Sequence, residues 1–345
     1  MTSTDVPRSM TATASAREYA ELAGLVRQAG LHRRRYHYYA VRITLNLLVF
    51  AAGWVGFVLL GDSWWQLLLA AFFAVMYAQL AFVGHDAGHG QVFTSRAAND
   101  VLGIAHGALV GMSYGRWVDQ HNRHHSHPNH ELRDPDVDIT VLAFTADQAA
   151  TKRGLVRWTS AHQAALFFPF LLLEGFSLHV SSVRVLLRGG TRARTVELPL
   201  LAAHVVVYLA AVFLVLSPLT AVVFVVVHQC LWGFYMGCAF APGHKGMPTV
   251  TGDDELGFFR RQILTTRNIS GGRVVDVVLG GLNHQIEHHL FPTMARPNLR
   301  HARPIVREFC ARNAIEYAEC GWLRTYVDVV EHLHAVSAPL RAAAR

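Results

Sequence analysis

Residues 198–244 form an uninterrupted stretch of 47 residues that contains no Asp, Glu, Lys or Arg. A membrane-spanning helix needs about 20 mostly apolar residues, so this stretch is long enough for two spans. Ser217 and Pro218, near its middle, favour a tight turn between them. Because a charged side chain is costly in the bilayer core, such a stretch indicates a membrane protein and argues against an ordinary soluble domain.

Two further charge-free stretches, 43–61 and 63–84, are 19 and 22 residues long. Charged residues make up only 16% of the chain, against about 25% in soluble domains. We therefore predict an all-α membrane protein with a cytoplasmic helical cap and four transmembrane helices, near 43–61, 64–84, 198–216 and 219–241. Two shorter apolar stretches, 101–115 and 158–173, are predicted to lie in the membrane interface.

All Lys and Arg residues lie outside the predicted spans and the two short connections between them. Seven precede residue 43, eleven lie within 85–197 and thirteen follow residue 241, which accounts for all 31. The positive-inside rule then places both termini and the 85–197 loop in the cytoplasm, in a multi-pass protein of the cell membrane or an endomembrane. This asymmetry accounts for the net charge of +7, and we predict no nucleic-acid partner.

These boundaries divide the chain into an N-terminal cytoplasmic segment (1–40), a membrane domain (41–310) and a C-terminal cytoplasmic tail (311–345). The first 20 residues are rich in Ser, Thr and Ala and lack the apolar core of a signal peptide, so they predict a flexible tail. No internal repeat or proline-rich linker indicates a second domain.

The 21 histidines concentrate in short clusters that follow the predicted spans. One cluster has the spacing i, i+4, and two others have i, i+3, i+4, with Gln in the first place of the last one. Each spacing puts its side chains on one face of a helix. The clustered residues are His85 and His89; His121, His124 and His125; Gln285, His288 and His289; and a single His244 just after the last span. The charge asymmetry places them all on the cytoplasmic side.

Imidazole nitrogens suit transition metals such as iron, copper, nickel and zinc. Eight histidines and one glutamine without a cysteine are too many for one tetrahedral ion, so two metal ions fit better. Four carboxylates near the clusters are placed to orient imidazole N–H groups, namely Asp86, Asp134, Asp136 and Glu287. The histidines without such spacing are expected to be structural or solvated.

The segments 117–125, 241–247 and 280–292 resemble the histidine motifs of the integral-membrane fatty acid desaturases. The third segment is most similar to the acyl-lipid and front-end subgroup, in which Gln opens the motif. The likeness extends over about residues 40–310. Two positions depart from the family pattern, because Gly243 stands where relatives often have Asn and Gln120 where many have Lys. The first departure removes a side chain beside His244.

The resemblance implies a catalytic centre of two Fe ions, cycling between Fe2+ and Fe3+, that uses O2 as co-substrate. It implies that a cis double bond enters a long-chain acyl substrate, carried by CoA or by a lipid. The implied catalytic ligands are His85, His89, His121, His124, His125, His288 and His289, with His244 as an eighth metal ligand. Side chains that could bind metal or orient a ligand are Gln285, His284, Asp86, Glu287 and Asn283.

The electrons for this reaction must come from outside the predicted membrane domain. The chain has no GxGxxG motif, and His127-Pro128-Asn129-His130 is not the His-Pro-Gly-Gly motif of a fused cytochrome b5 domain. We therefore expect a separate donor, either a ferredoxin or a cytochrome b5-like protein with its reductase.

Two other functions stay open. A hydroxylase of lipid, alkane or carotenoid would use the same metal centre and differ only in the fate of the substrate radical. A metal transporter or metal sensor would need histidines or carboxylates along a path through the spans, and only His204 and His228 lie there.

Overall fold

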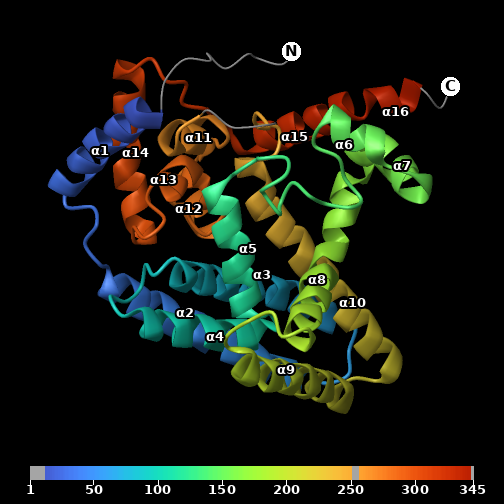
Figure 1. The fold of residues 1–345 in the computed structure, drawn as a ribbon. Helices are drawn as coiled ribbons and strands as arrows, with labels where there is room; N and C mark the ends of the chain where they lie inside the picture. Colours follow the sequence, from blue (N-terminus) through green and yellow to red (C-terminus); the bar gives the residue numbers. More distant parts are fainter. Residues whose placement is uncertain (1–11, 251–255, 343–345) are drawn as a thin grey trace. The chain divides into compact units, whose positions relative to one another are not determined.

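The computed structural model describes residues 12–250 and 256–342, and these are mostly helical. They fall into two compact units, each built from separate stretches of the chain. Unit 1 comprises Met1–Arg33, His121–Leu166 and Phe240–Arg345, and unit 2 comprises Arg34–Gln120 and Phe167–Ala239. The prediction of an all-α membrane protein is confirmed in its helical character (Figure 1).

Unit 2 consists of long apolar helices. They are α2 (Tyr36–Leu60), α3 (Gln66–Gly88), α4 (Arg96–Val110), the first half of α5 (Tyr114–Ser126), most of α8 (Gln163–Leu187), α9 (Arg194–Val215) and α10 (Pro218–Phe240). Aromatic rings fill the core between α2, α3, α9 and α10, where Trp54 and Phe73 have ring centroids 4.6 Å apart. Phe57 and Phe224 in the same core are 5.1 Å apart.

Within residues 12–250 and 256–342, five helices are long and apolar enough to cross a membrane, namely α2, α3, α8, α9 and α10. Four of them cover the predicted spans, but the predicted count of four is not confirmed. Helix α8 is the addition: it runs 25 residues and includes much of the stretch that we assigned to the interface. Glu174 ends this charge-free run in the sequence and Arg184 ends the next one, although the helix continues past both.

The outward surfaces of these helices are apolar. Leu59 of α2, Val207 of α9 and Leu219 of α10 are each more than 60% exposed within the protein. Water would hydrate such surfaces unfavourably, whereas lipid chains cover them at no cost. The exposure pattern therefore suits helices that face a bilayer.

Helix α4 ends inside unit 2, where its terminal carbonyl groups find side-chain partners. Gly111 closes the helix in the left-handed conformation (φ 74°), and its carbonyl lies 2.7 Å from Nδ1 of His179 on α8. Glu197 of α9 then accepts the backbone N–H of Gly115 at 2.9 Å and the hydroxyl of Ser113. These contacts fix the start of α5, the helix that carries the second histidine cluster.

Unit 1 is made of shorter elements. They are α1 (Ala12–Gln28), the end of α5, α6 (Ala146–Thr151), α7 (Gly154–Ala161), η1 (Ala241–Gly243), α11 (Phe258–Leu264), β1 (Asn268–Ser270), α12 (Arg273–Val278), η2 (Leu282–His284), α13 (Gln285–Leu290), α14 (Arg296–Arg312), β2 (Glu319–Gly321), α15 (Trp322–Val336) and α16 (Ala338–Ala342). The strands β1 and β2 pair in parallel, with Ile269 opposite Cys320.

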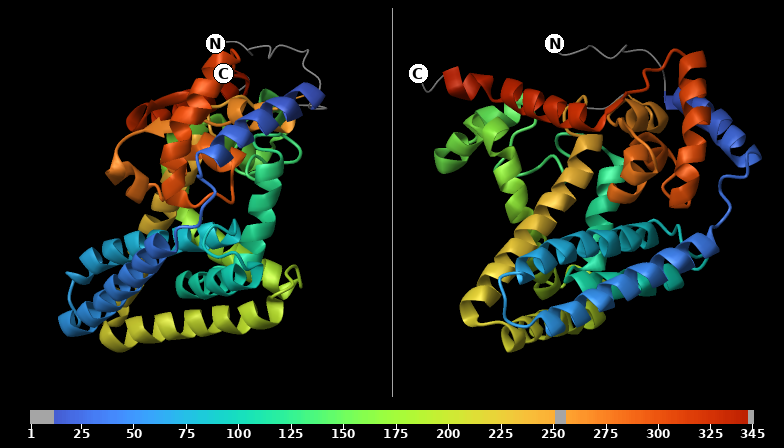
Figure 2. Two further views of the ribbon diagram at one scale, coloured as in Figure 1. Left: turned by 90° about the vertical axis from the view of Figure 1, so that its left-hand side faces the viewer. Right: turned by 180° about the vertical axis from the view of Figure 1, so that it is seen from behind.

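The core of unit 1 lies between α1, α11, α13 and α14. Leu22 of α1, Phe259 of α11, Ile286 of α13 and Phe309 of α14 are all completely buried there. Helices α1 and α14 lie side by side in every view (Figure 2). The prediction of a flexible tail over the first 20 residues is thus wrong for residues 12–20, which belong to α1, because the apolar side of this helix packs into the core. Residues 1–11 lie outside the described part of the chain.

Candidate metal centre

Six histidines from three separate segments meet inside unit 1. Two pairs of rings are especially close, with centroids 4.0 Å apart for His125 and His289 and 4.4 Å apart for His124 and His244. All six imidazoles are buried, which is unusual for polar rings. The six are His121, His124 and His125 of α5, His244 after η1, and His288 and His289 of α13. The helical spacing predicted for both clusters is confirmed.

The ring nitrogens face one another at distances that suit metal ligands. Nε2 of His124 lies 3.2 Å from Nε2 of His244, and Nε2 of His121 lies 3.1 Å from Nε2 of His125. Two nitrogens bound to one ion at about 2.1 Å, at angles of 90–110°, would be about 3.0–3.4 Å apart. Ligand atoms of His124, His244 and His289 all lie within 4.8 Å of one another. The donor set therefore fits a transition metal that prefers nitrogen.

Asp134 fixes the orientation of His124. Its carboxylate lies 2.9 Å from Nδ1 of His124, which directs Nε2 toward the other imidazoles. Burial alone would lower the pKa of His124, but the carboxylates of Asp134 and Asp136 raise it above its usual value. Burial alone would raise the pKa of Asp134, but His124 and Lys245 bring it down to about 2. A metal ion that binds Nε2 would therefore displace a proton from this pair.

The pKa of His244 shifts the opposite way. Burial, with the positive charges of His124 and Lys245 nearby, holds the pKa of His244 well below its usual value. The ring is therefore neutral at physiological pH, as a metal ligand must be.

Gln262 of α11 orients two further members of the cluster. Its side-chain oxygen lies 2.9 Å from Nδ1 of His289, and its side-chain nitrogen donates to the backbone carbonyl of His125 at 3.0 Å. Gln262 is completely buried. No pattern in the sequence marks this residue, because it stands outside every histidine cluster and has no distinctive spacing.

Gln285 occupies the space that Gly243 leaves. The amide group of Gln285 lies 2.7 Å from Nε2 of His244. A Cβ atom at position 243 would lie 2.9 Å from Cγ of Gln285, so only glycine lets the two segments approach this closely. The missing side chain noted beside His244 is thus replaced by an amide from α13.

Glu287 faces away from the imidazoles and anchors its own helix. Its carboxylate accepts hydrogen bonds from the side chain of Asn268 at 2.7 Å and from the hydroxyl of Tyr317 at 2.8 Å. Asn268 also accepts the backbone N–H of Ile286 at 2.9 Å. Burial raises the pKa of Glu287 despite these bonds. The structure therefore places Glu287 as a support for the helix of His288 and His289.

His284 and Asn283 point to another carboxylate. Nε2 of His284 lies 3.1 Å from Asp276 of α12, and the side chain of Asn283 donates to the same carboxylate oxygen at 2.8 Å. Among the described residues, His284 belongs to no group of His, Cys, Asp or Glu side chains spaced to hold a metal ion. Their geometry favours a structural role at the turn before α13.

The first histidine pair lies in unit 2, at the end of α3. The rings of His85 and His89 are 4.7 Å apart, as the i, i+4 spacing predicts. Nδ1 of His85 lies 3.3 Å from Asp86, whose carboxylate also accepts the hydroxyl of Tyr39 at 3.1 Å. Trp117 packs over Gly88, where a Cβ atom would lie 2.4 Å from the indole ring. This pair is thus buried and oriented by its own unit.

This chain is similar in sequence to a known protein family. Residues 62–321 match the family model described as fatty acid desaturase. An acyl-lipid (9-3)-desaturase of Physcomitrium patens is 30% identical over 336 residues, covering 91% of this chain and 63% of the relative. A delta(5) fatty acid desaturase of Caenorhabditis elegans is 32% identical over 262 residues, covering 72% and 58%. The chain thus spans about three fifths of the length of these two relatives.

Proposed function

The chain belongs to the fatty acid desaturase family, and from this premise we propose that it introduces a cis double bond into a long-chain acyl substrate at a di-iron centre. The buried cluster of six imidazoles in unit 1 is the observation that carries this proposal. The balanced reaction takes one O2, two electrons and two protons, converts CH2–CH2 of the acyl chain into CH=CH, and releases two waters.

We assign eight imidazoles as iron ligands. Six lie in unit 1, and the nitrogen separations of two pairs, His124 with His244 and His121 with His125, suit two ligands of one ion. The other two, His85 and His89, are assigned from the family motif and from their own i, i+4 geometry on α3. Gln285 stands beside His244 and is the candidate for a ninth contact. The full ligand set is His85, His89, His121, His124, His125, His244, His288 and His289.

Bound iron supplies what no side chain can, the oxidising power to remove hydrogen from an unactivated methylene group. The protein's own residues keep the ligands in place for this work. Asp134 and Gln262 hold Nδ1 of His124 and His289, so that both rings present Nε2 to the centre. Such partners of ligating histidines typically affect metal affinity by about 10–100-fold. Burial of the imidazoles excludes water, which would otherwise compete for open coordination positions.

The substrate and the electron donor follow from the same family assignment. We propose a long-chain acyl-CoA or acyl-lipid substrate that enters from the bilayer, because an acyl chain partitions there. Electrons come from a separate ferredoxin, or from a cytochrome b5-like protein with its reductase. The protein is multi-pass in the cell membrane or an endomembrane, with both termini and the metal centre in the cytoplasm, as the distribution of Lys and Arg indicates.

Expression in a host that lacks the activity, followed by mass analysis of its fatty acids, tests this function. A desaturase yields products that lack two hydrogen atoms, and double-bond mapping then locates the change. Products that gain an oxygen atom would instead indicate a hydroxylase. Transport of metal without any lipid product would indicate the transporter.

A pair of histidine variants makes the test specific to the metal centre. His124→Ala should abolish the product while the protein remains in the membrane. The control is His162→Ala, which removes an exposed imidazole whose hydrogen bond and ring contact are both with Trp158, four residues earlier. Retained activity in His124→Ala would contradict the ligand assignment.

A further inference from the structure

One arginine makes several hydrogen bonds to the loop that carries His244. Arg267 lies directly before β1, and its side chain is only 4% exposed. Its Nε donates to the carbonyl of Pro242 at 2.7 Å, and a terminal nitrogen donates to the carbonyl of Lys245. The backbone N–H of Arg267 donates to Gly243 at 2.9 Å. Three carbonyl groups on both sides of His244 thus bind one residue.

The guanidinium is fixed in turn by helix α15. The carboxylate of Asp328 lies 2.9 Å from one terminal nitrogen, and the carbonyl of Thr325 lies 3.4 Å from the other. A buried guanidinium without such a partner would be strongly unfavourable. The backbone of α15 also approaches the loop closely, because a Cβ atom on Gly246 (φ 85°) would lie 3.0 Å from the Asp328 carbonyl.

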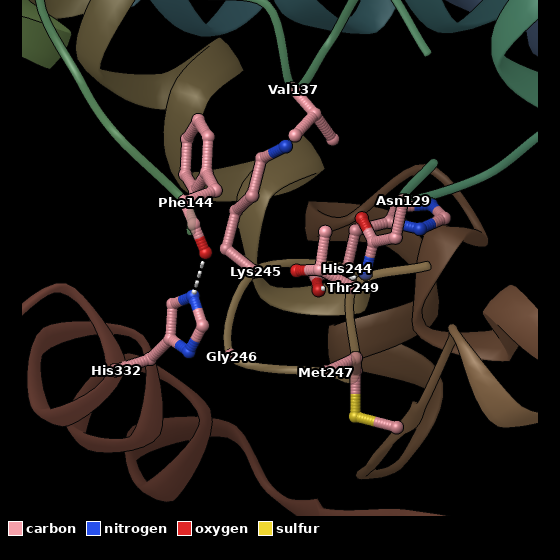
Figure 3. Close-up of a pocket in the computed structure, with 9 residues that line it drawn as sticks. All are labelled: Asn129, Val137, Phe144, His244, Lys245, Gly246, Met247, Thr249 and His332. Carbon is pink, nitrogen blue, oxygen red and sulfur yellow. Dashed lines mark hydrogen bonds between the residues drawn. The ribbon is translucent and has the colours of Figure 1, made fainter. Parts of the chain in front are cut away.

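A second set of contacts joins the same loop to α15. Figure 3 shows Lys245 extending from the loop toward Phe144 and Val137, while His332 of α15 approaches the Phe144 carbonyl. Nε2 of His332 lies 3.1 Å from that carbonyl, and the Lys245 ammonium lies 4.2 Å from the centre of the Phe144 ring. The loop is therefore enclosed by α15 and the 137–144 segment, whereas His244 points the other way, to His124.

Helix α15 lies outside the part of the chain that matches the family model. The match ends at residue 321, and α15 begins at Trp322. None of its residues approaches the imidazole cluster as a candidate ligand among the described residues. Arg267 gives α15 a direct connection to the loop that carries His244.

We propose that Arg267 is a positioning residue, which its ion pair with Asp328 orients so that its hydrogen bonds to Pro242 and Lys245 aim the His244 imidazole at the metal centre. This inference rests on the proposed function, because it requires that the cluster binds metal. Helix α15 then acts on the reaction without touching substrate, oxygen or iron. The Asn129 amide also binds this loop, at the carbonyls of His244 and Pro248, but within the described residues it makes no hydrogen bond to α15.

Conservative variants separate positioning from folding. Arg267→Lys keeps the buried positive charge but loses the planar fork that reaches two carbonyls and a carboxylate together. Asp328→Asn keeps the shape of the partner but weakens its hold on the guanidinium. The matched control is Arg324→Gln, which removes the partner of Asp328 on the solvent side, where the Arg324 side chain is 58% exposed.

The first measurement is the affinity of the purified, metal-free full chain for Co(II), monitored by visible ligand-field absorption. The second is the midpoint of thermal unfolding of the same protein. We expect Arg267→Lys and Asp328→Asn to bind Co(II) about 10–100-fold more weakly than wild type. The absorption spectrum should also change, because the ligand geometry changes. The Co(II) affinity of Arg324→Gln should stay within about 3-fold of wild type, because an exposed ion pair contributes little.

A double-variant cycle decides whether the effect passes through His244. In a His244→Ala background, Arg267→Lys should cause no further loss of Co(II) affinity, because the group it positions is gone. Equal losses in both backgrounds, or a lower thermal midpoint with unchanged affinity, would overturn the proposal. A wild-type chain that binds no Co(II) would refute the metal centre as well, whereas wild-type binding with unaffected variants would refute the positioning role alone.

Discussion

Asn268 connects β1 to the helix of the third histidine cluster, and its removal should destabilise unit 1. The residue is completely buried. In Asn268→Ala, the backbone N–H of Ile286 loses its 2.9 Å partner, and the Glu287 carboxylate loses a 2.7 Å hydrogen bond. A buried group left without a partner costs about 1–3 kcal/mol, and a bond to a charged group contributes about 1.5–3 kcal/mol. The two losses together predict that the free energy of unfolding falls by about 3–5 kcal/mol.

Thermal unfolding of the purified protein in detergent measures this loss. For a unit of this size, 1 kcal/mol corresponds to about 2–4 °C, so we expect the midpoint to fall by about 10 °C. Iron content should fall with it, because His288 and His289 lie on the helix that Asn268 anchors. The control is Asn313→Ala, which removes an exposed side chain bonded to its own helix and should shift the midpoint by less than about 2 °C. An Asn268→Ala midpoint equal to that of the control would refute the reasoning.

Three further variants test other parts of the site. Gly243→Ala should displace Gln285 from His244 and weaken Co(II) binding by about 10-fold. The control is Gly272→Ala, where the added Cβ meets no atom within 4 Å and the affinity should not change. Equal Co(II) affinities of the two variants would contradict the close packing of Gln285 against Gly243. His284→Ala should leave the iron content unchanged, because its imidazole pairs with Asp276, and a loss of iron would make it a ligand. Asp134→Asn should lower the stability of the metal-free protein by about 2 kcal/mol near pH 5, where His124 is protonated, since the folded-state pKa of Asp134 is about 2. That contribution is present above the unfolded-state pKa and is lost as the pH falls through the folded one, so thermal midpoints of wild type and variant should converge near pH 2; a gap that does not change with pH would contradict the assigned pKa.

The histidine clusters could be predicted because their chemistry is local. Spacings of three and four residues put imidazoles on one face of a helix independently of the tertiary fold. Both clusters do lie on helices, α5 and α13. The apolar stretches likewise predict helices from composition alone. The fifth candidate span, α8, was missed because Glu174 and Arg184 interrupt its apolar run, although one helix carries both.

The supporting residues could not be predicted because their partners are distant in the sequence. Gln262, Asn268 and Arg267 act through hydrogen bonds to segments 18 to 137 residues away. No spacing in the chain marks such contacts before the fold is known. Glu287 illustrates the same limit: its place among the histidines suggested a role at the metal, whereas the fold turns it toward Tyr317.

The iron content of the purified wild-type chain tests the central claim most directly. We predict two iron ions per chain by elemental analysis, with His124→Ala and His289→Ala each retaining less than wild type and the surface variant His162→Ala retaining both. A wild-type chain with no bound iron after reconstitution under reducing conditions, or full iron occupancy in His124→Ala, would contradict the account.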